Sequence, residues 1–358
     1  MTPNDIATLR LMNQQIARAA YNTPAEVVAA MGAMQAQDYM GALWSIGLRL
    51  PHATEADIEQ AITERTIVRT WPMRGTLHFV APADVRWMLE LLTPRIVAGS
   101  AGRHKQLGLD AAIFTHSRKI LTKALQGGQR LTREDAMAVL ERNGISTAGQ
   151  RGYHILGRLA HDGLICFGPR AGKQHTFVLL EEWVPAARKL ERDEALAELA
   201  RRYFISHGPA TLQDFAWWSG LKISDARAGL AMAASHLVQE SVGGMDYWMR
   251  ADAHSMPHVA PSTFLLPGFD QFLLGYTDRS AALAPQHAQK IIPGGNGMFM
   301  PTLVVNGQVA GTWKRTITKK AVTIELSPFA ALKKPETQAI AIAVQRYGQF
   351  LGLAVQLS

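Results

Sequence analysis

The chain has 358 residues, of which 47% are hydrophobic, and it carries 37 lysines and arginines against 29 aspartates and glutamates. This length predicts two to four domains, and the hydrophobic content excludes a disordered chain. The formal net charge of +8 is typical of a protein that meets a polyanion, most often nucleic acid.

Membrane and secreted proteins are not expected from this sequence. No apolar run approaches the roughly 20 residues needed to span a bilayer, and the N-terminus lacks the regions of a signal peptide. The single cysteine, Cys166, lies in the apolar run LICFG, where we expect an inert core residue and no disulfide within the chain. We therefore expect a cytoplasmic protein with no membrane partner.

The first 110 residues predict helices followed by a short antiparallel strand pair. Threonine and proline, with a glutamate shortly after them, form a capping pattern that predicts a helix over residues 23–37. Further helices are expected over 42–50 and 54–64. Two extended segments, TIVRTWP and GTLHFVA, then flank a turn at 73–75. This order of elements is typical of a winged helix, a helix-turn-helix with an added β-hairpin wing.

The same order of elements recurs twice. Helices over 116–127, 132–142 and 147–162 precede the segments LICFG and HTFVLL, which flank the basic turn PRAGKQ, and a further copy ends on LVQES and DYWMR. Glycine, proline and strand signals dominate the rest of the chain. The predicted fold class is therefore α+β, with three tandem winged-helix units at 1–110, 111–185 and 186–260 and a C-terminal β-rich domain at 261–358.

No familiar cofactor site is predicted. The segment GPRAGKQ lacks the spacing of a phosphate-binding loop, and no strand–helix unit encloses GGNG at 294–297. The histidines have no metal-ligand spacing, since Pro257 breaks any helix that would pair His254 with His258. We expect neither a metal nor a cofactor.

Basic side chains gather at the predicted recognition helices, wings and C-terminal strands, where winged-helix proteins contact phosphates. An ordinary solvated charge remains the alternative for each one taken singly. Trp313, beside two basic residues in GTWKR, is the best of the tryptophans as a base-stacking candidate. With it, the candidate DNA-binding residues are Arg69, Arg74, Arg151, Lys173, Lys314 and Arg315.

Two glutamines stand in the otherwise apolar stretch GAMQAQDYMGAL. Gln35 and Gln37 are either solvated residues at a helix end or part of a site whose chemistry needs hydrogen-bonding groups that do not ionise. On a regular helix, residues two apart point about 200° away from each other. Either the helix ends near Gln35, or only one glutamine touches the reacting group. Asp38 is an alternative catalytic carboxylate, although an aspartate at a helix end is commonly a cap.

Four stretches in order resemble one family. QAQD at 35–38, TWPMRGTLH at 70–78, LLPGFDQFLLGYTDR at 265–279 and GTWKR at 311–315 are similar to the AlkZ/YcaQ family of winged-helix DNA glycosylases, over nearly the full chain. The resemblance implies tandem winged helices in a C shape with a basic concave face. It also implies that Gln35 and Gln37 are the catalytic pair. Gln37 stands where the YcaQ branch carries aspartate, which places the chain nearer the azinomycin-resistance branch.

The implied activity is removal of alkylated purines from double-stranded DNA, extending to interstrand crosslinks. An N7-alkylguanine is cationic and departs as a neutral base, so the enzyme need only stabilise an oxocarbenium-like sugar and place a water, which an amide carbonyl can do. We expect a monofunctional hydrolase that acts as a monomer at the nucleoid. The alternative is a non-catalytic winged-helix regulator, although nothing in the chain predicts the dimer helix that regulators typically use.

Overall fold

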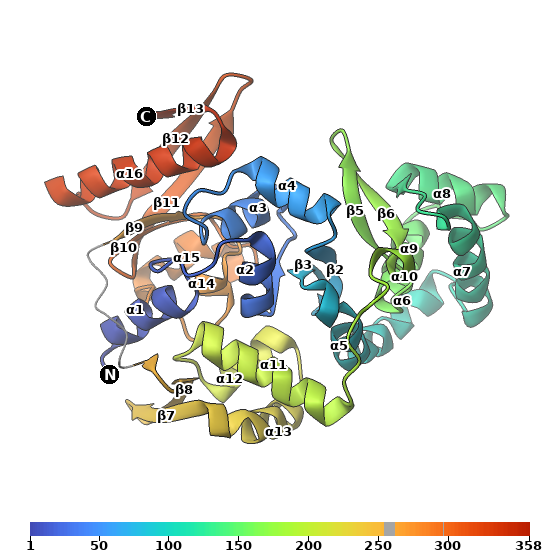
Figure 1. The fold of residues 1–358 in the computed structure, drawn as a ribbon, viewed down its shortest axis with the longest axis horizontal. Coiled ribbons are helices and arrows are strands. Elements are labelled where there is room, and N and C mark those ends of the chain that lie inside the picture. Colours follow the sequence, from blue (N-terminus) through green and yellow to red (C-terminus); the bar gives the residue numbers. More distant parts are fainter. Residues whose placement is uncertain (254–261, 296) are drawn as a thin grey trace. The chain divides into compact units, whose positions relative to one another are not determined.

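The computed structural model describes residues 1–253, 262–295 and 297–358. His254, His258 and the third residue of the GGNG turn lie outside these ranges. The described chain has the predicted α+β character, with helices and β-sheets in both of its compact parts (Figure 1). Unit 1 comprises Met1–Ile58 with Leu196–Ser358, and unit 2 comprises Glu59–Ala195.

Capping residues set the first helices of unit 1. Thr23 and Glu26 exchange side-chain-to-backbone hydrogen bonds, with Pro24 at the first helical position, as the sequence predicts. The predicted continuation to residue 37 is wrong. Gly32 adopts a φ of +75°, and the chain leaves the helix there to become a short strand. The elements are α1 (Pro3–Asn13), α2 (Pro24–Met31), β1 (Ala33–Gln35) and α3 (Tyr39–Gly47).

The C-terminal part of unit 1 is β-rich, as predicted, and is built on a five-stranded sheet in the order β13-β12-β11-β10-β9. Neighbouring strands are antiparallel, except that β12 and β13 are parallel. Helix α16, red in Figure 1, packs against β9, β12 and β13. The elements are β9 (Thr263–Leu266), α14 (Gln271–Leu274), α15 (Ala288–Ile291), β10 (Thr302–Val305), β11 (Gln308–Ile317), β12 (Ala321–Pro328), α16 (Lys334–Leu351) and β13 (Ala354–Leu357).

A second helical group of unit 1 precedes a β-hairpin. Its core is aromatic, with Tyr203, Phe204, Phe215 and Trp218 all fully buried. Thr211 caps α12 through a capping box, and Gly220 ends it in the left-handed conformation. The elements are α11 (Arg192–His207), α12 (Leu212–Ser219), α13 (Ile223–Ala233), β7 (Leu237–Val242) and β8 (Met245–Arg250).

Unit 2 combines a sheet with helices that precede its hairpins. Its strands run in the order β3-β2-β5-β6-β4, and the three helices predicted over residues 116–162 are present with shifted bounds. The strands are β2 (Val68–Met73), β3 (Thr76–Val80), β4 (Leu131–Thr132), β5 (Ile165–Ala171) and β6 (Gln174–Leu179). The helices are α5 (Val85–Gly99), α6 (Ala101–Gln106), α7 (Ala111–Leu125), α8 (Arg133–Arg142), α9 (Arg151–His161) and α10 (Leu180–Trp183), and α4 (Glu55–Thr63) spans the boundary between the units.

Candidate active site

The two glutamines lie in a strand-to-helix connection, which removes the difficulty that a helix would have separated them. Gln35 is the last residue of β1 and is 7% exposed, whereas Gln37 is exposed. The Gln35 Oε1 atom accepts a hydrogen bond from the backbone N–H of Gln37 at 3.0 Å. The buried amide therefore fixes the backbone from which the exposed amide projects.

Asp38 caps the next helix. Its Oδ1 accepts a hydrogen bond from the backbone N–H of Gly41 at 3.2 Å, at the first turn of α3. A side chain at Gly41 would collide with this carboxylate, since a Cβ atom there would lie 2.4 Å from Asp38 Oδ2. The expectation that an aspartate here is a helix cap is confirmed.

A buried ion pair lies at the far end of α3. Arg49 and Asp270 meet through two hydrogen bonds of 2.9 and 3.0 Å, and Ser45 Oγ donates to the same carboxylate at 2.6 Å. Burial would raise the pKa of Asp270, but the Arg49 guanidinium and the hydrogen bonds from Ser45 and the Phe272 N–H hold it below its usual value. Asp270 therefore has a structural hydrogen-bonding role, with Arg49 as its charged partner.

Trp313 belongs to the core, so the prediction that it stacks on a base is wrong. It is 2% exposed, and its indole N–H donates to the Leu266 carbonyl at 2.8 Å. Trp44, on α3, donates likewise to the neighbouring Leu265 carbonyl at 2.7 Å. Both indoles pack edge-on against Tyr347, at centroid distances of 5.2 and 5.0 Å. Strand β9 thus anchors α3 to the sheet.

The basic residues of unit 2 that are predicted to bind DNA differ in how accessible their side chains are. Arg69 is only 3% exposed, with its guanidinium 4.8 Å from the centroid of Phe167, so its burial argues against a phosphate contact. Arg151 donates to the backbone carbonyls of Ser146, Leu107 and Gly108, which engages its guanidinium at the start of α9.

The hairpin turns of unit 2 carry two further candidates. Lys173 is exposed in the β5–β6 turn. Arg74 lies in the β2–β3 turn with a φ of +54° and places Nη2 3.5 Å from Nε2 of His78.

His78, in the TWPMRGTLH stretch, is a buried residue that the sequence did not single out. Burial lowers the pKa of its ring to about 3, with the Arg74 charge adding to the effect and the Thr76 carbonyl opposing it. Nδ1 lies 2.9 Å from that carbonyl, so Nδ1 carries the proton and Nε2 faces Arg74 as an acceptor. His78 is therefore neutral at physiological pH.

The two candidates of unit 1 lie on β11. Lys314 is exposed, and Arg315 is half-buried and donates to the Tyr347 hydroxyl at 2.5 Å. Of the residues predicted to bind DNA, Lys173 and Lys314 are therefore the most accessible.

Neither a thiol site nor a metal centre is found among the described residues. Cys166 is fully buried, and burial raises the pKa of its thiol. Within residues 1–253, 262–295 and 297–358, no group of three or more histidine, cysteine, aspartate or glutamate side chains could hold a metal ion. The helices in the described part of the chain are all too short or too polar to cross a membrane.

Comparison with known proteins identifies the class. The family model for DNA glycosylase AlkZ-like proteins matches residues 28–350. The chain therefore belongs to the AlkZ-like DNA glycosylases, as the sequence motifs indicate, and is a DNA repair enzyme that acts on DNA rather than a non-catalytic regulator.

Two comparisons, both with Streptomyces sahachiroi, show the particular relationship. An interstrand DNA cross-link repair glycosylase is 25% identical over 356 residues, covering 92% of this chain and 91% of its own. The solved structure of the DNA glycosylase AlkZ superposes with a TM-score of 0.80 at 22% identity, over 100% of both chains. This structural match shows that the two chains share a fold.

Proposed function

We propose that the protein hydrolyses the N-glycosidic bond of cationic N7-alkylguanine-type purines in double-stranded DNA, and that its range includes unhooking of interstrand crosslinks. The observation that carries the proposal is the hydrogen bond from the Gln37 backbone to the Gln35 side chain, which joins a buried amide to an exposed one. The relative named as a cross-link repair glycosylase supports the substrate class.

The proposed chemistry suits amides that do not titrate. An N7-alkylated guanine already carries the positive charge that makes it a good leaving group, so no acid is needed. The remaining demand is to stabilise positive charge on the sugar and to hold a water near C1′. The Gln37 carbonyl would meet both demands, because it accepts from water and directs its dipole at developing positive charge.

The two glutamines have different roles in this proposal. Gln37 contacts the water and the sugar, since it is the exposed member of the pair. Gln35 is a positioning residue, since its carbonyl accepts the N–H of residue 37 and its burial keeps it in one place. The pair would then act without a metal or cofactor and without a covalent intermediate, as a monofunctional hydrolase.

We further propose that the helix groups followed by hairpins are winged helices. Helices α7, α8 and α9 before β5–β6, and α11, α12 and α13 before β7–β8, have the order of elements that supports this assignment. The corresponding domains are 1–110, 111–185, 186–260 and 261–358. Several winged-helix units in one chain suit the recognition of a single lesion without a second copy of the protein. We therefore propose a monomer associated with nucleoid DNA in the cytoplasm.

The direct test uses a duplex with one N7-methylguanine at a known position. Wild-type protein is incubated with it, and heat or alkali then converts each abasic site into a strand break. The expected result is more breaks at the methylated guanine than in the same duplex treated identically without protein, and none in an unmodified duplex. A duplex that stays intact under conditions where the protein binds it would contradict the proposed substrate class.

A further inference from the structure

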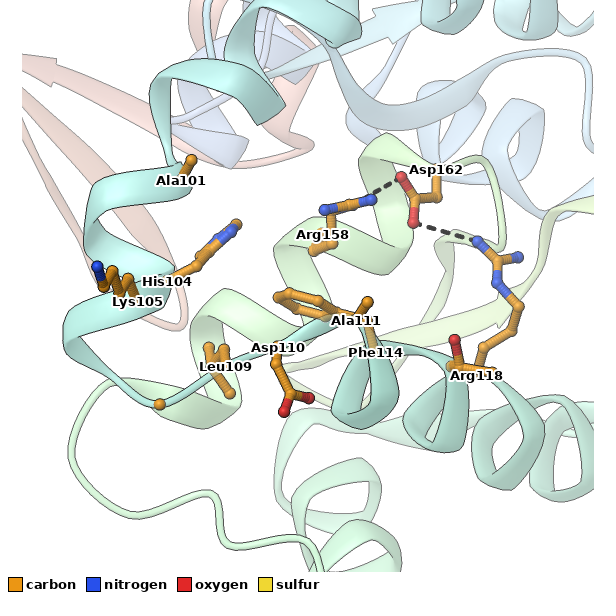
Figure 2. A pocket seen from close by; sticks show the side chains of 12 residues that line it. Ala101, His104, Lys105, Leu109, Asp110, Ala111, Phe114, Arg118, Arg158 and Asp162 are labelled. Atoms are coloured by element: carbon orange, nitrogen blue, oxygen red, sulfur yellow. Dashed lines mark hydrogen bonds and ion pairs between the residues drawn. The ribbon is translucent and has the colours of Figure 1, made fainter.

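A second site of different character lies entirely within unit 2. A cavity of about 560 Å³ opens between α6, α7 and the end of α9 (Figure 2). This volume lies within the range of about 300–1,000 Å³ that is typical of small-molecule sites. Gln35 and Gln37 belong to the other unit, so the cavity is not made by the glutamine motif.

The floor of the cavity is largely apolar and aromatic. His104, Leu109 and Phe114 line it, and all three side chains are largely buried. The rings of His104 and Phe114 meet edge-to-face with their centroids 5.1 Å apart. The small exposed parts of these two rings give the cavity an aromatic wall that a flat ligand can contact.

The rim carries more positive than negative charge. Arg118 and Arg158 approach the single carboxylate of Asp162 from two sides, at 3.2 and 2.8 Å (Figure 2). One carboxylate neutralises only one guanidinium, and each guanidinium has five N–H groups, so the pair retains donors and one net positive charge. Exposed Lys105 adds to this charge, whereas the Asp110 carboxylate accepts from the Ile113 N–H at 2.8 Å as a helix cap.

Arg158 connects the rim to the floor. Its guanidinium lies 5.1 Å from the centroid of the Phe114 ring. Arginine planes and aromatic rings are the two kinds of surface on which unpaired bases stack. Burial lowers the pKa of His104, and the nearby His154 and Arg158 lower it further. This environment disfavours an additional positive charge.

We propose that this cavity binds a nucleotide, with the base against Phe114 and His104 and the phosphate at the Lys105, Arg118 and Arg158 rim. A lone phosphate would leave the aromatic floor without a complementary partner, and an apolar ligand would leave the cationic rim without one. A base paired inside a duplex cannot enter. The occupant is therefore either a free nucleotide or an unpaired nucleotide of DNA, which share this chemistry.

The test titrates full-length protein with 2-aminopurine deoxyribonucleoside monophosphate, whose fluorescence is quenched when its base stacks. We expect saturable quenching, with the corresponding nucleoside binding about tenfold more weakly because it lacks the phosphate. A DNA hairpin with the same base in a bulge, compared with the same base paired, tests the DNA source. If the protein quenches the fluorescence of the free nucleotide, the natural ligand is a free nucleotide. If it quenches only the bulged hairpin, the natural ligand is unpaired DNA.

Matched variants distinguish the cavity from general charge attraction. Lys105→Gln and Arg118→Gln should each weaken binding of the quenched probe about five- to tenfold, the loss expected for one charge-assisted contact. Lys119→Gln and Arg142→Gln remove the same kinds of charge from exposed positions of unit 2 that do not line the cavity, and should leave binding unchanged.

Phe114→Leu should remove most of the quenching, and thermal melting checks that this variant folds. If Phe114→Leu does not fold, Lys105→Gln and Arg118→Gln at the rim still test the proposal. No saturable quenching by either probe, or equal losses in the rim variants and their controls, would overturn the proposal. It does not rest on the glycosylase assignment, because excision at the glutamine pair is measured separately.

Discussion

Gln35 and Gln37 are joined by a hydrogen bond of 3.0 Å from the backbone N–H of the second to the side-chain carbonyl of the first. The bond is possible because α2 ends at Met31 and the chain passes through a strand before α3 begins. On a continuous helix the two side chains would diverge. The end of helix α2 at Gly32 therefore creates the geometry that the proposed chemistry uses.

Gln35→Ala tests the supporting role of the buried amide. It removes the acceptor of the Gln37 N–H, so the exposed amide loses its fixed position, and excision should slow about tenfold or more. DNA affinity should stay near normal, and the unfolding free energy should fall by about 1 kcal/mol, as for the loss of one hydrogen bond. Single-turnover excision and a binding isotherm measure the two effects.

The control for that variant is Gln345→Ala, at an exposed position of α16. It should change neither excision nor affinity. If both glutamines act on one water, the double variant Gln35→Ala/Gln37→Ala should lose less than the two single losses combined. Fully independent losses would show that Gln35 does not act through Gln37.

DNA binding should be strongly salt-dependent and weakly sequence-specific. If about six phosphates are contacted, affinity should fall about 10³-fold between 50 and 200 mM salt. Lys173→Gln and Lys314→Gln should each reduce the salt slope by about one, because both side chains are exposed. Arg69→Gln is the control. Its side chain is buried, so it should lower stability and leave the slope unchanged. A nearly flat salt dependence would exclude the electrostatic model.

The Arg49–Asp270 pair should stabilise unit 1 and make it acid-sensitive. Asp270→Ala leaves a buried guanidinium without its carboxylate and should cost about 3–5 kcal/mol in denaturant unfolding. Asp252→Ala breaks an exposed pair with Arg250 in the same unit and should cost under about 1 kcal/mol. A cost for Asp270→Ala as small as that of the control would contradict the assigned role of the pair.

The pH dependence of this pair has a definite sign. The pKa of Asp270 is lower in the folded protein than its usual value of about 3.9, so its stabilising contribution is present above that pH. The contribution is lost as pH falls through the folded pKa. The difference in unfolding free energy between the wild type and Asp270→Asn should therefore shrink as pH falls below about 4. A difference that grows with acidity would reverse the assignment.

Excision should proceed without a Schiff base. No lysine lies near Gln35 and Gln37 in the sequence, and the proposed mechanism uses water rather than an amine. Borohydride added during turnover should trap no covalent DNA adduct, and EDTA should leave the rate unchanged. A trapped adduct that disappears in Lys314→Gln would show that this lysine reaches the abasic site as a nucleophile.

Local patterns predicted much of this fold. The Thr23–Pro24 cap marked the start of α2, and glycine, proline and strand signals marked the β-rich C-terminal part. The end of α2 was missed because the apolar residues after Gly32 continue the helical pattern, while the glycine takes a positive φ of +75° that ends the helix. Backbone conformation, rather than hydrophobicity, ends the helix at this point.

The features of the site that the sequence did not predict depend on contacts between residues far apart in the chain. Asp270 lies in a clearly patterned stretch, but its partner Arg49 is 221 residues away. Trp313 sits beside two basic residues, yet strand alternation turns it inward while Lys314 faces solvent. His78 is neutral only because the fold buries it beside Arg74. Such pairings depend on tertiary packing, which local periodicity does not encode.

The most direct test of the proposed catalysis is single-turnover excision by Gln37→Ala on a defined N7-methylguanine duplex, beside its binding isotherm. Loss of a preorganised hydrogen-bonding group typically costs about 10²–10³ in rate, and the activated substrate should soften this to about tenfold. Gln37→Asp should keep partial activity, since a carboxylate also binds water and stabilises positive charge. We predict slower excision with unchanged affinity. A wild-type rate in Gln37→Ala would mean that the exposed glutamine has no part in the reaction.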